Sequence, residues 1–549
     1  MDLQRLFLFF IFTFSLFMVW DGWQKHQHPE TGIQQSEIPD KNKTKTEVPS
    51  VSKLVQSGPI SNQQDNASSA RMIKVRTDVI EAEISTKGGD IDRLALLKHP
   101  DALDKNRPLV LFEQGPGTHN YIAQSGLIGD GLPNHNTIFD SEQEQYELIG
   151  DSDQIQVKLK ALPQSDLKVT KIITFHKGSY VINVSYELEN TGKKVISTSP
   201  YFQLVRDSNP PSGSLRFLPT YTGAAVYSDK EKFQKVEFKD IDNNKTKYAK
   251  QTEDGWIGML QHYFVAAWLP EDKIHREYFI RKLDENLYSI GFVYPTLTLE
   301  PGKHVSADTR LYVGPTESNL DKVAQGLGLT VDYGWLTIIA TPLFWIMSLI
   351  HGWTHNWGVA IVLLTVLIKL LFFPLSAASY RSMAKMRVVA PKLEKIKQQY
   401  ADDREQLNRA MMELYKTEKI NPLGGCLPVL IQIPVFIALY WAILSSVELR
   451  FAPFYGWITD LSSADPYYVL PIIMGASMII QMRLNPKPPD PIQAKVMQVM
   501  PIMFSVMFFF FPAGLVLYSI VNNILSILQQ WYITKTAGGE GRGGNTSKR

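Results

Sequence analysis

NWGVAIVLLTVLIKLLFFP, residues 356–374, decides how the rest of the chain is organised. Its nineteen residues, at about 1.5 Å each, make an α-helix of about 28 Å, close to the roughly 30 Å of a hydrocarbon core. The stretch therefore predicts a membrane-spanning helix. It carries a single charge, Lys369, and a lysine at the bilayer centre costs about 2.5–3.5 kcal/mol on insertion scales.

Two interpretations of Lys369 stay open. Its ammonium can extend to the cytoplasmic headgroups, because Pro374 follows only five residues later. Alternatively, the ammonium faces a wet cavity inside the membrane. Thr365 favours the cavity, because residues i and i+4 share a helix face and its hydroxyl would lie beside the ammonium.

Charge and hydropathy divide the 549 residues into segments. The 56 Lys and Arg nearly balance 54 Asp and Glu, so the net charge gives no reason to expect DNA as a partner. Residues 6–20 are uncharged and no small-residue cleavage pattern follows, which predicts a transmembrane signal anchor over 1–23 with a cytoplasmic N-terminus. Residues 24–70 are polar and lack aromatics, which predicts a disordered linker.

Residues 71–318 alternate between apolar and polar side chains, as in MIKVRTDVIEAEIS (72–85) and QIQVKLKAL (154–162). This period of two is typical of strands with one buried face and predicts one large antiparallel β-sandwich. The segment has no cysteine, and its histidines lack metal-ligand spacing. The whole chain lacks GxSxG, HExxH and P-loop patterns, so we assign no catalytic residue, metal or cofactor.

Positive charge predicts the topology of the apolar half. Residues 379–420 hold ten Lys and Arg against six Asp and Glu, which predicts a cytoplasmic segment, whereas 448–466 hold one basic and three acidic residues, as expected outside. One crossing must then separate an outside β domain from 379–420. Residues 319–355, with sixteen uncharged residues at 335–350, are therefore predicted to lie along the outer interface as an amphipathic helix.

Apolar runs and their breaks predict the other spans. We expect five core spans, with Pro512 and Gly514 separating the last two, at about 356–376, 423–447, 467–482, 495–511 and 514–533. With the N-terminal anchor, this is a polytopic α-helical membrane protein of six spans with a five-span core at 356–533. A basic cytoplasmic tail follows at 534–549.

A cytoplasmic helical hairpin is predicted at 379–420, with Pro391 in the first turn of one helix and Asp403 capping the other. Its basic arm consists of Arg381, Lys385, Arg387, Lys392 and Lys395. Two interpretations stay open. The hairpin is a solvated pair of helices that satisfies the topology, or the basic arm binds anionic lipid, an RNA or a protein partner.

Polar side chains in the last span recur at spacings of three and four, which predicts that they share one side of the helix: Ser519, Asn522, Asn523, Ser526, Gln529 and Gln530. Hydrogen bonds between helices explain two or three amides. Together with Lys369, Thr365 and Gln432 the set is larger than packing needs, and it predicts a polar groove. In the preceding span, Met500, Met503 and Met507 either fill core gaps or form an adaptable sliding surface that faces lipid.

Five motifs closely resemble those of the bacterial YidC membrane protein insertases of the YidC, oxidase-assembly and Albino family: NPLGGCLPVLIQIPVFIALYW (421–441), SMAKMR (382–387), SVELR (446–450), DPYYVLP (465–471) and FPAGLVLYSIVNN (511–523). The resemblance covers essentially the whole chain, in the Gram-negative form with a large periplasmic domain. It implies an inner-membrane insertase and chaperone, not an enzyme, that works alone or beside the Sec translocon. It also implies a periplasmic β-supersandwich similar to sugar mutarotases, and a hydrophilic groove open to cytoplasm and lipid.

The resemblance also implies roles for single residues. The groove cation of that family is typically arginine and the matching residue is Lys369, so the charge remains while the planar fork does not. Tyr518 matches a tyrosine of the groove, and the second tyrosine of many relatives is Ser519 here. The implied partners are nascent inner-membrane proteins, Sec translocon components, and a ribosome or signal recognition receptor.

Two functions of other classes stay open from the residues. A membrane transporter would also have a polar intramembrane site, but repeated half-helices around a midplane pocket should mark it, and the chain shows no such repeat. A carbohydrate-binding β domain anchored to the membrane is the second, and sugar titration of residues 71–318 would test it.

Overall fold

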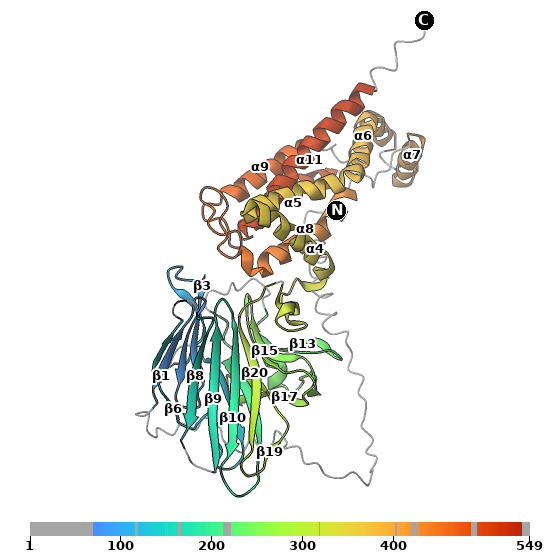
Figure 1. Ribbon diagram of the computed structural model, residues 1–549. Coiled ribbons are helices and arrows are strands. Elements are labelled where there is room, and N and C mark those ends of the chain that lie inside the picture. Colours follow the sequence, from blue (N-terminus) through green and yellow to red (C-terminus); the bar gives the residue numbers. More distant parts are fainter. Residues whose placement is uncertain are drawn as a thin grey trace, which may run out of the picture. The chain divides into compact units, whose positions relative to one another are not determined.

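The computed structural model describes residues 70–115, 119–148, 150, 152–162, 166–211, 221–317, 319–400, 403–418, 427–484 and 491–540. The chain forms two compact units, a β unit that ends at Asp332 and a helical unit that begins at Tyr333 (Figure 1). The predicted N-terminal anchor and almost all of the predicted linker lie outside the described residues.

The β unit contains two large sheets. In the 11-stranded sheet the order is β14-β17-β18-β11-β5-β3-β2-β1-β7, with β19 on β11 and β4 on β3. In the nine-stranded sheet the order is β13-β12-β15-β16-β20-β10-β9-β8-β6. The strands are β1 Met72–Arg76, β2 Ile80–Ser85, β3 Ile91–Pro100, β4 Pro108–Phe112, β5 Tyr121–Ile128, β6 Phe139–Ser141, β7 Gln145–Glu147, β8 Gln154–Ala161, β9 Leu167–His176, β10 Val181–Asn190, β11 Ile196–Asp207, β12 Gly223–Ser228, β13 Lys232–Val236, β14 Gln251–Thr252, β15 Trp256–Gln261, β16 Phe264–Pro270, β17 Arg276–Asp284, β18 Leu287–Val293, β19 Leu297–Leu299 and β20 His304–Pro315.

The predicted period of two is confirmed in these strands. Exposed and buried residues alternate along β8, and partly exposed and buried residues alternate along β10. The buried faces of the two sheets meet, because Phe202 of the 11-stranded sheet lies 5.2 Å from Trp268 and 6.0 Å from Tyr186 of the other, between ring centroids. The core of the β unit is therefore the apolar layer between its sheets.

The end of the β unit is formed by two short 3-10 turns, η1 (Leu320–Lys322) and η2 (Leu327–Thr330). Leu320 and Leu327 are buried in one apolar cluster with Tyr227 and Trp256 of the strands. These turns therefore fold with the strands. The predicted interfacial segment began at residue 319 and had included them. A third turn, η3 (Gly334–Leu336), leads into the helical unit.

The helical unit contains the apolar half of the chain. Its helices are α4 Thr337–Thr354, α5 Trp357–Leu371, α6 Phe373–Gln399, α7 Arg404–Thr417, α8 Leu427–Ser445, α9 Val469–Leu484, α10 Pro491–Phe508 and α11 Ala513–Glu540. The break predicted at Pro512 is confirmed, because α10 ends before it and α11 begins after it. The first seven residues of the predicted tail continue α11 instead of leaving it.

Some of these helices have the length and composition of a membrane span. Within the described residues, two helices meet this criterion individually: Gly334–Thr354 and Ala513–Thr536. The helices Trp357–Leu371 and Phe373–Met386 meet the criterion only when they are taken together, and the chain bends by 65° between them. Ile431–Ser445 and Val469–Leu484 are shorter apolar helices.

The residues at the two ends of the stretch 356–374, Asn356 and Pro374, mark the start of α5 and the start of α6. Asn356 caps α5, because its side chain accepts a hydrogen bond of 3.0 Å from the backbone N–H of Val359. Pro374 lies in the first turn of α6, where a missing N–H costs least, and α5 ends three residues before it. The 65° bend therefore lies at Phe372, between the two helices.

The predicted hairpin corresponds to α6 and α7. Asp403 caps α7 as predicted, accepting hydrogen bonds from the backbone of Glu405 and Gln406 at 3.0 Å each. The helix start predicted at Pro391 is wrong, because α6 runs through Pro391 without a break. An internal proline removes one backbone hydrogen bond, and a helix that packs along its length can continue past it.

The loop 446–468 packs against the starts of α5 and α11. The backbone N–H of Ala513 donates to the Ser463 carbonyl at 2.7 Å, and that of Gly514 donates to Leu461 at 2.9 Å. Phe454 lies against Gly358 so closely that an added Cβ would come within 2.1 Å of its ring. The loop therefore closes the end of the helical unit at which α5 and α11 begin.

Candidate functional site

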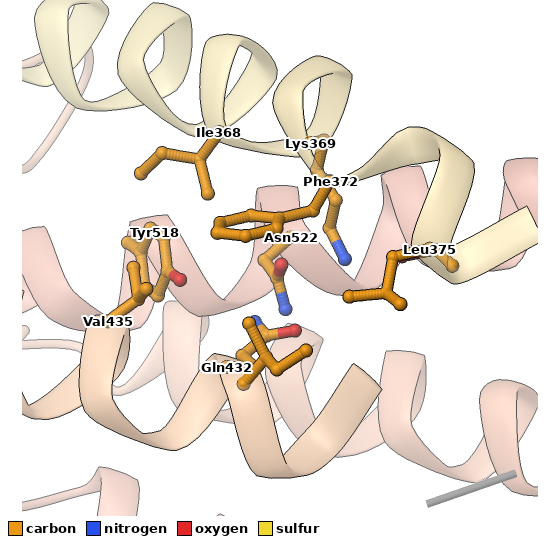
Figure 2. A pocket seen from close by; sticks show the side chains of 10 residues that line it. Ile368, Lys369, Phe372, Leu375, Gln432, Val435, Tyr518 and Asn522 are labelled. Carbon is orange, nitrogen blue, oxygen red and sulfur yellow. The ribbon is translucent and has the colours of Figure 1, made fainter. Parts of the chain in front are cut away.

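Four helices of the helical unit surround a small pocket with about 30 Å³ of interior space (Figure 2). Its lining residues come from the end of α5, the start of α6, and the facing turns of α8 and α11: Ile368, Lys369, Phe372, Leu375, Ser376, Ile431, Gln432, Val435, Tyr518 and Asn522. Lys369, Gln432, Tyr518 and Asn522, which the sequence assigns to a polar groove, thus meet in one place. The pocket combines one cation and a few polar groups with apolar walls.

Lys369 lies in the last turn of α5 and is half-buried. Its ammonium donates a hydrogen bond of 2.7 Å to Ser526 Oγ on α11, and Ser526 Oγ donates to the Asn522 carbonyl at 2.7 Å. Within the described part of the chain, no carboxylate lies close enough to act on this ammonium. The side chain points between the helices (Figure 2), which favours the cavity interpretation over extension to the headgroups.

The polar residues of α11 divide between two neighbouring helices. Ser526 and Gln529 face the α5–α6 side, where Gln529 Nε2 donates to the Phe373 carbonyl at 3.3 Å. Asn523 faces α9 and donates to Ser477 Oγ at 3.2 Å. The six positions share one side of α11, within an arc of about 120° at about 100° per residue, but that side contacts both the α5–α6 helices and α9, so the polar residues divide between them.

Two predicted groove residues bond to their own helix instead of lining the pocket. Thr365 Oγ1 donates to the Ile361 carbonyl at 2.7 Å, and Ser519 Oγ donates to the Leu515 carbonyl at 2.8 Å. Both side chains are buried. Such bonds to the preceding turn are common for Ser and Thr within helices, so the structure gives these two a packing role.

The sequence interpretation missed the apolar walls of the pocket. Ile368, Phe372 and Leu375 lie beside Lys369 along the bend, and Val435 lies one turn after Gln432. These residues carry no chemical signal of their own. Their helical spacing from the two polar residues is the signal that identifies them.

The predicted sliding surface lies on α10. Met503 and Met507 are exposed there, while the Met500 side chain lies outside the described part. Exposure is what a surface that faces lipid or a client helix requires, and the role stays a prediction.

The predicted basic arm lies on α6. Arg381, Lys385, Lys392 and Lys395 are exposed, and the Arg387 side chain lies outside the described part. Lys392 Nζ pairs with Glu418 Oε1 at 2.6 Å. The other three leave a solvated positive surface on the helix that follows the pocket.

In the β unit, His135 is half-buried and its Nδ1 lies 2.5 Å from the Tyr201 hydroxyl. Burial lowers the pKa of His135 to about 4, and the positive charges of Arg281, Lys87 and Lys171 act in the same direction. The described residues contain no group of three or more His, Cys, Asp or Glu that could hold a metal ion. His135 is thus a neutral, hydrogen-bonded histidine.

Comparisons with known proteins cover almost the entire chain. The family profile described as "YidC periplasmic domain" matches residues 72–346, and that described as "60Kd inner membrane protein" matches residues 349–540. The membrane protein insertase YidC of Nitrosospira multiformis is 52% identical over 569 residues, with 100% of this chain and 99% of that protein covered. The protein of the same name from Methylobacillus flagellatus is 53% identical over 541 residues, with 98% of each covered. A crystal structure of an active YidC insertase with its first transmembrane domain resolved is 18% identical, at a TM-score of 0.38, and covers 84% of this chain and 95% of that one.

Proposed function

The chain belongs to the YidC family of membrane protein insertases, and we propose that its pocket at Lys369 receives the polar end of a client protein during insertion. It is an inner-membrane insertase with a large periplasmic β domain and a helical membrane region. The family is a class of insertases, so we infer a mechanism by binding and release, without a covalent step or cofactor.

The physical task of an insertase is to move a polar tail across about 30 Å of hydrocarbon. A polar pocket among the helices shortens the dry part of that path. The apolar segment of the client then leaves sideways into lipid, where burial at about 25 cal/mol per Å² drives completion. The mechanism needs a site that holds the tail only for a short time.

The proposal rests on the surroundings of the Lys369 ammonium. Its ammonium has one neutral oxygen, Ser526 Oγ, as its hydrogen-bond partner in the described part of the chain, at 2.7 Å. A half-buried cation without a counter-charge attracts any carboxylate that enters the pocket. Gln432 and Asn522 offer amides beside it for the backbone of a tail.

We further propose six spans with both termini in the cytoplasm. The charge distribution supports this topology, since it places 379–420, 483–495 and the tail inside and 448–466 outside. The loop 446–468, which packs on the starts of α5 and α11, would then close the pocket toward the periplasm.

In this topology α4 lies along the outer interface. Its exposed face carries Trp335, Ile338, Trp345 and Trp353, at 71%, 84%, 62% and 87% exposure, with the first in the turn that leads into the helix. Tryptophan is enriched at the headgroup level, because its ring is apolar and its N–H is polar. The opposite face, with Ala340, packs against the other helices.

The partners beyond client proteins are proposals as well. The exposed basic arm on α6 supports contacts with anionic lipid, a ribosome or a signal recognition receptor on the cytoplasmic side. Cooperation with Sec translocon components rests on the family resemblance.

The test is insertion yield for paired clients that differ only in the charge of the leading tail. Lys369→Arg should retain insertion of both clients, because the charge stays. Lys369→Met should reduce insertion of the acidic-tailed client about ten-fold and leave the neutral-tailed client nearly unchanged. A charge pair about 6 Å apart at an effective dielectric of about 20 gives roughly 3 kcal/mol, and water in the pocket lowers this toward the 1.4 kcal/mol of a ten-fold change.

Lys535→Met is the matched control. Lys535 is an exposed lysine on α11 that lies over the ring of Trp531 and outside the pocket. Its loss should affect both clients equally. Equal yields for both clients in Lys369→Met, at matched protein level, would leave the charge mechanism without support.

A further inference from the structure

The wall of the pocket crosses the bend between α5 and α6. Ile368 and Lys369 belong to α5, Phe372 is the joint, and Leu375 and Ser376 belong to α6. The facing wall comes from α8 and α11. Because one wall consists of two helices set at 65°, a change in this angle must change the width of the pocket.

The backbone hydrogen bonding is weakened at the joint, although the Phe372 N–H donates to the Ile368 carbonyl and the Ser376 N–H donates to the Phe372 carbonyl, at 3.0 Å each. Pro374 has no N–H and cannot continue the hydrogen-bond ladder of α5 into α6. A joint of this kind needs outside contacts to hold one angle.

α11 supplies these contacts on both sides of the joint. On the α5 side, Lys369 donates to Ser526. On the α6 side, Gln529 Nε2 donates to the Phe373 carbonyl at 3.3 Å. Further along α6, Ala377 and Tyr380 form a buried cluster with Ile533 of α11.

We propose that Gln529 is a positioning residue, whose hydrogen bond to the first carbonyl of α6 fixes the α5–α6 angle and thereby the width of the pocket. This bond is directional and lies at the first residue of α6, whereas the hydrogen bond between Tyr380 and Ser526 lies seven residues further along α6. The apolar contacts of Ile533 permit sliding, whereas a bond to a backbone carbonyl fixes orientation. The same α6 carries the exposed basic arm.

The geometry of α6 makes the angle measurable. Val388 lies sixteen residues after Phe372, about 24 Å along the helix at about 1.5 Å per residue. A tilt of about 15° at the joint therefore moves Val388 by about 6 Å. Val388 and, on α11, Tyr532 are both exposed, at 78% and 59%, and can carry spin labels without entering the pocket.

The experiment uses the full chain in lipid vesicles, with Cys426, its single cysteine, changed to serine and cysteines in place of Val388 and Tyr532 for nitroxide labels. Electron–electron distance measurements without client should give one narrow distribution for the parent protein. Gln529→Met keeps the length of the side chain but cannot donate, and should broaden or shift the distribution by about 5 Å or more. Gln529→Glu, which also cannot donate, should do the same, whereas Gln529→Lys keeps a donor and should restore the narrow distribution.

Gln530→Met is the matched control. Gln530 is the next residue of α11, but its amide donates to the Leu484 carbonyl of α9 at 3.1 Å and faces away from the joint. It should leave the label distance unchanged. On the same preparations, the insertion yield of a single-span client should fall for Gln529→Met and return with Gln529→Lys.

An unchanged distance distribution in both Gln529→Met and Gln529→Glu would overturn the proposal, and so would a broadened distribution with unchanged insertion. The inference rests on the proposed function of the pocket but not on the charge of Lys369. The label distance is measured without client. If the Lys369 variants show no dependence on tail charge, the proposal for Gln529 is therefore unaffected, and an unchanged label distance likewise leaves the charge mechanism unaffected.

Discussion

Asp465→Asn replaces one carboxylate oxygen by an amide nitrogen, and this small change should strongly destabilise the loop 446–468 that closes the end of the helical unit. Asp465 is almost fully buried, and its Oδ1 accepts hydrogen bonds from Trp457 Nε1 and the Tyr467 backbone, both at 3.0 Å. Its Oδ2 accepts from the backbone N–H of Leu470 at 2.7 Å, in the first turn of α9. One carboxylate thus joins the loop 446–468 to the start of a helix.

The magnitude follows from these three bonds. An asparagine has one acceptor oxygen, so its amide N–H₂ must face a donor that the carboxylate had bound. A buried unsatisfied donor costs about 1–3 kcal/mol, and the remaining bonds lose their charge assistance. We expect about 2 kcal/mol for local opening, which is roughly a 30-fold change in the opening equilibrium.

The assay is hydrogen exchange by mass spectrometry on the full-length protein in detergent. The peptide that contains Tyr467 and Leu470 should exchange about 30-fold faster in Asp465→Asn. The matched control is Asp403→Asn, at the exposed cap of α7, where Asn and Asp are about equally good caps and the change should stay within about two-fold. Equal acceleration at both sites would refute the claim that burial and the three donors set the cost.

Three further predictions follow from the fold and the charges. Cysteines placed at Val388, which is 78% exposed, and at Ser462 should label from opposite sides of the membrane, and labelling from the same side would overturn the six-span topology. Deletion of residues 72–331, which removes the strands together with the turns that pack on them, should preserve insertion of a simple single-span client, and its loss in a stable truncated protein would show that the β unit takes part. The pKa of His135 lies near 4 in the folded β unit against 6.5 ordinarily, so its neutral form contributes stability that is present above pH 6.5 and lost as the pH falls through 4. His135→Gln should therefore flatten the loss of protection of β5 between pH 7 and 4 by about 1–2 kcal/mol, measured by hydrogen exchange, and an unchanged pH profile would contradict this.

The sequence predicts elements well where one physical pattern acts alone. Alternation predicted the strands of the β unit, and the proline and glycine after Phe511 predicted the break between α10 and α11. Asp403 was identified as a cap because an exposed cap depends on local residues. The helix start predicted at Pro391 was wrong. A proline is compatible with either a helix start or a helix interior, and the packing of α6 decides between them.

The candidate site was predicted in its polar residues and not in its arrangement. Spacing along α11 gives angles on that helix, but which angle meets which neighbour depends on helices far away in sequence. Ser526 meets Lys369, 157 residues earlier, while Asn523 meets α9. A pattern within one helix contains neither fact, and the apolar walls of the pocket have no pattern that separates them from other lipid-facing or core residues.

The one hydrogen bond that Lys369 makes within the described residues helps to explain why a lysine suits this position. An ammonium is a compact cation with three donors, and here one of them is directed to Ser526 Oγ. The other two remain for water or for a client carboxylate. A guanidinium would bring five donors in a fixed fork, and more of them would need partners in a pocket whose polar atoms come chiefly from Gln432, Tyr518 and Asn522. Lysine therefore suits a site that must hold a carboxylate weakly and release it, since it attracts charge without imposing a bidentate geometry. The corresponding expectation is that Lys369→Arg retains insertion while slowing release of an acidic tail. The lifetime of a client crosslinked from the pocket measures this, and an unchanged or shorter lifetime would contradict it.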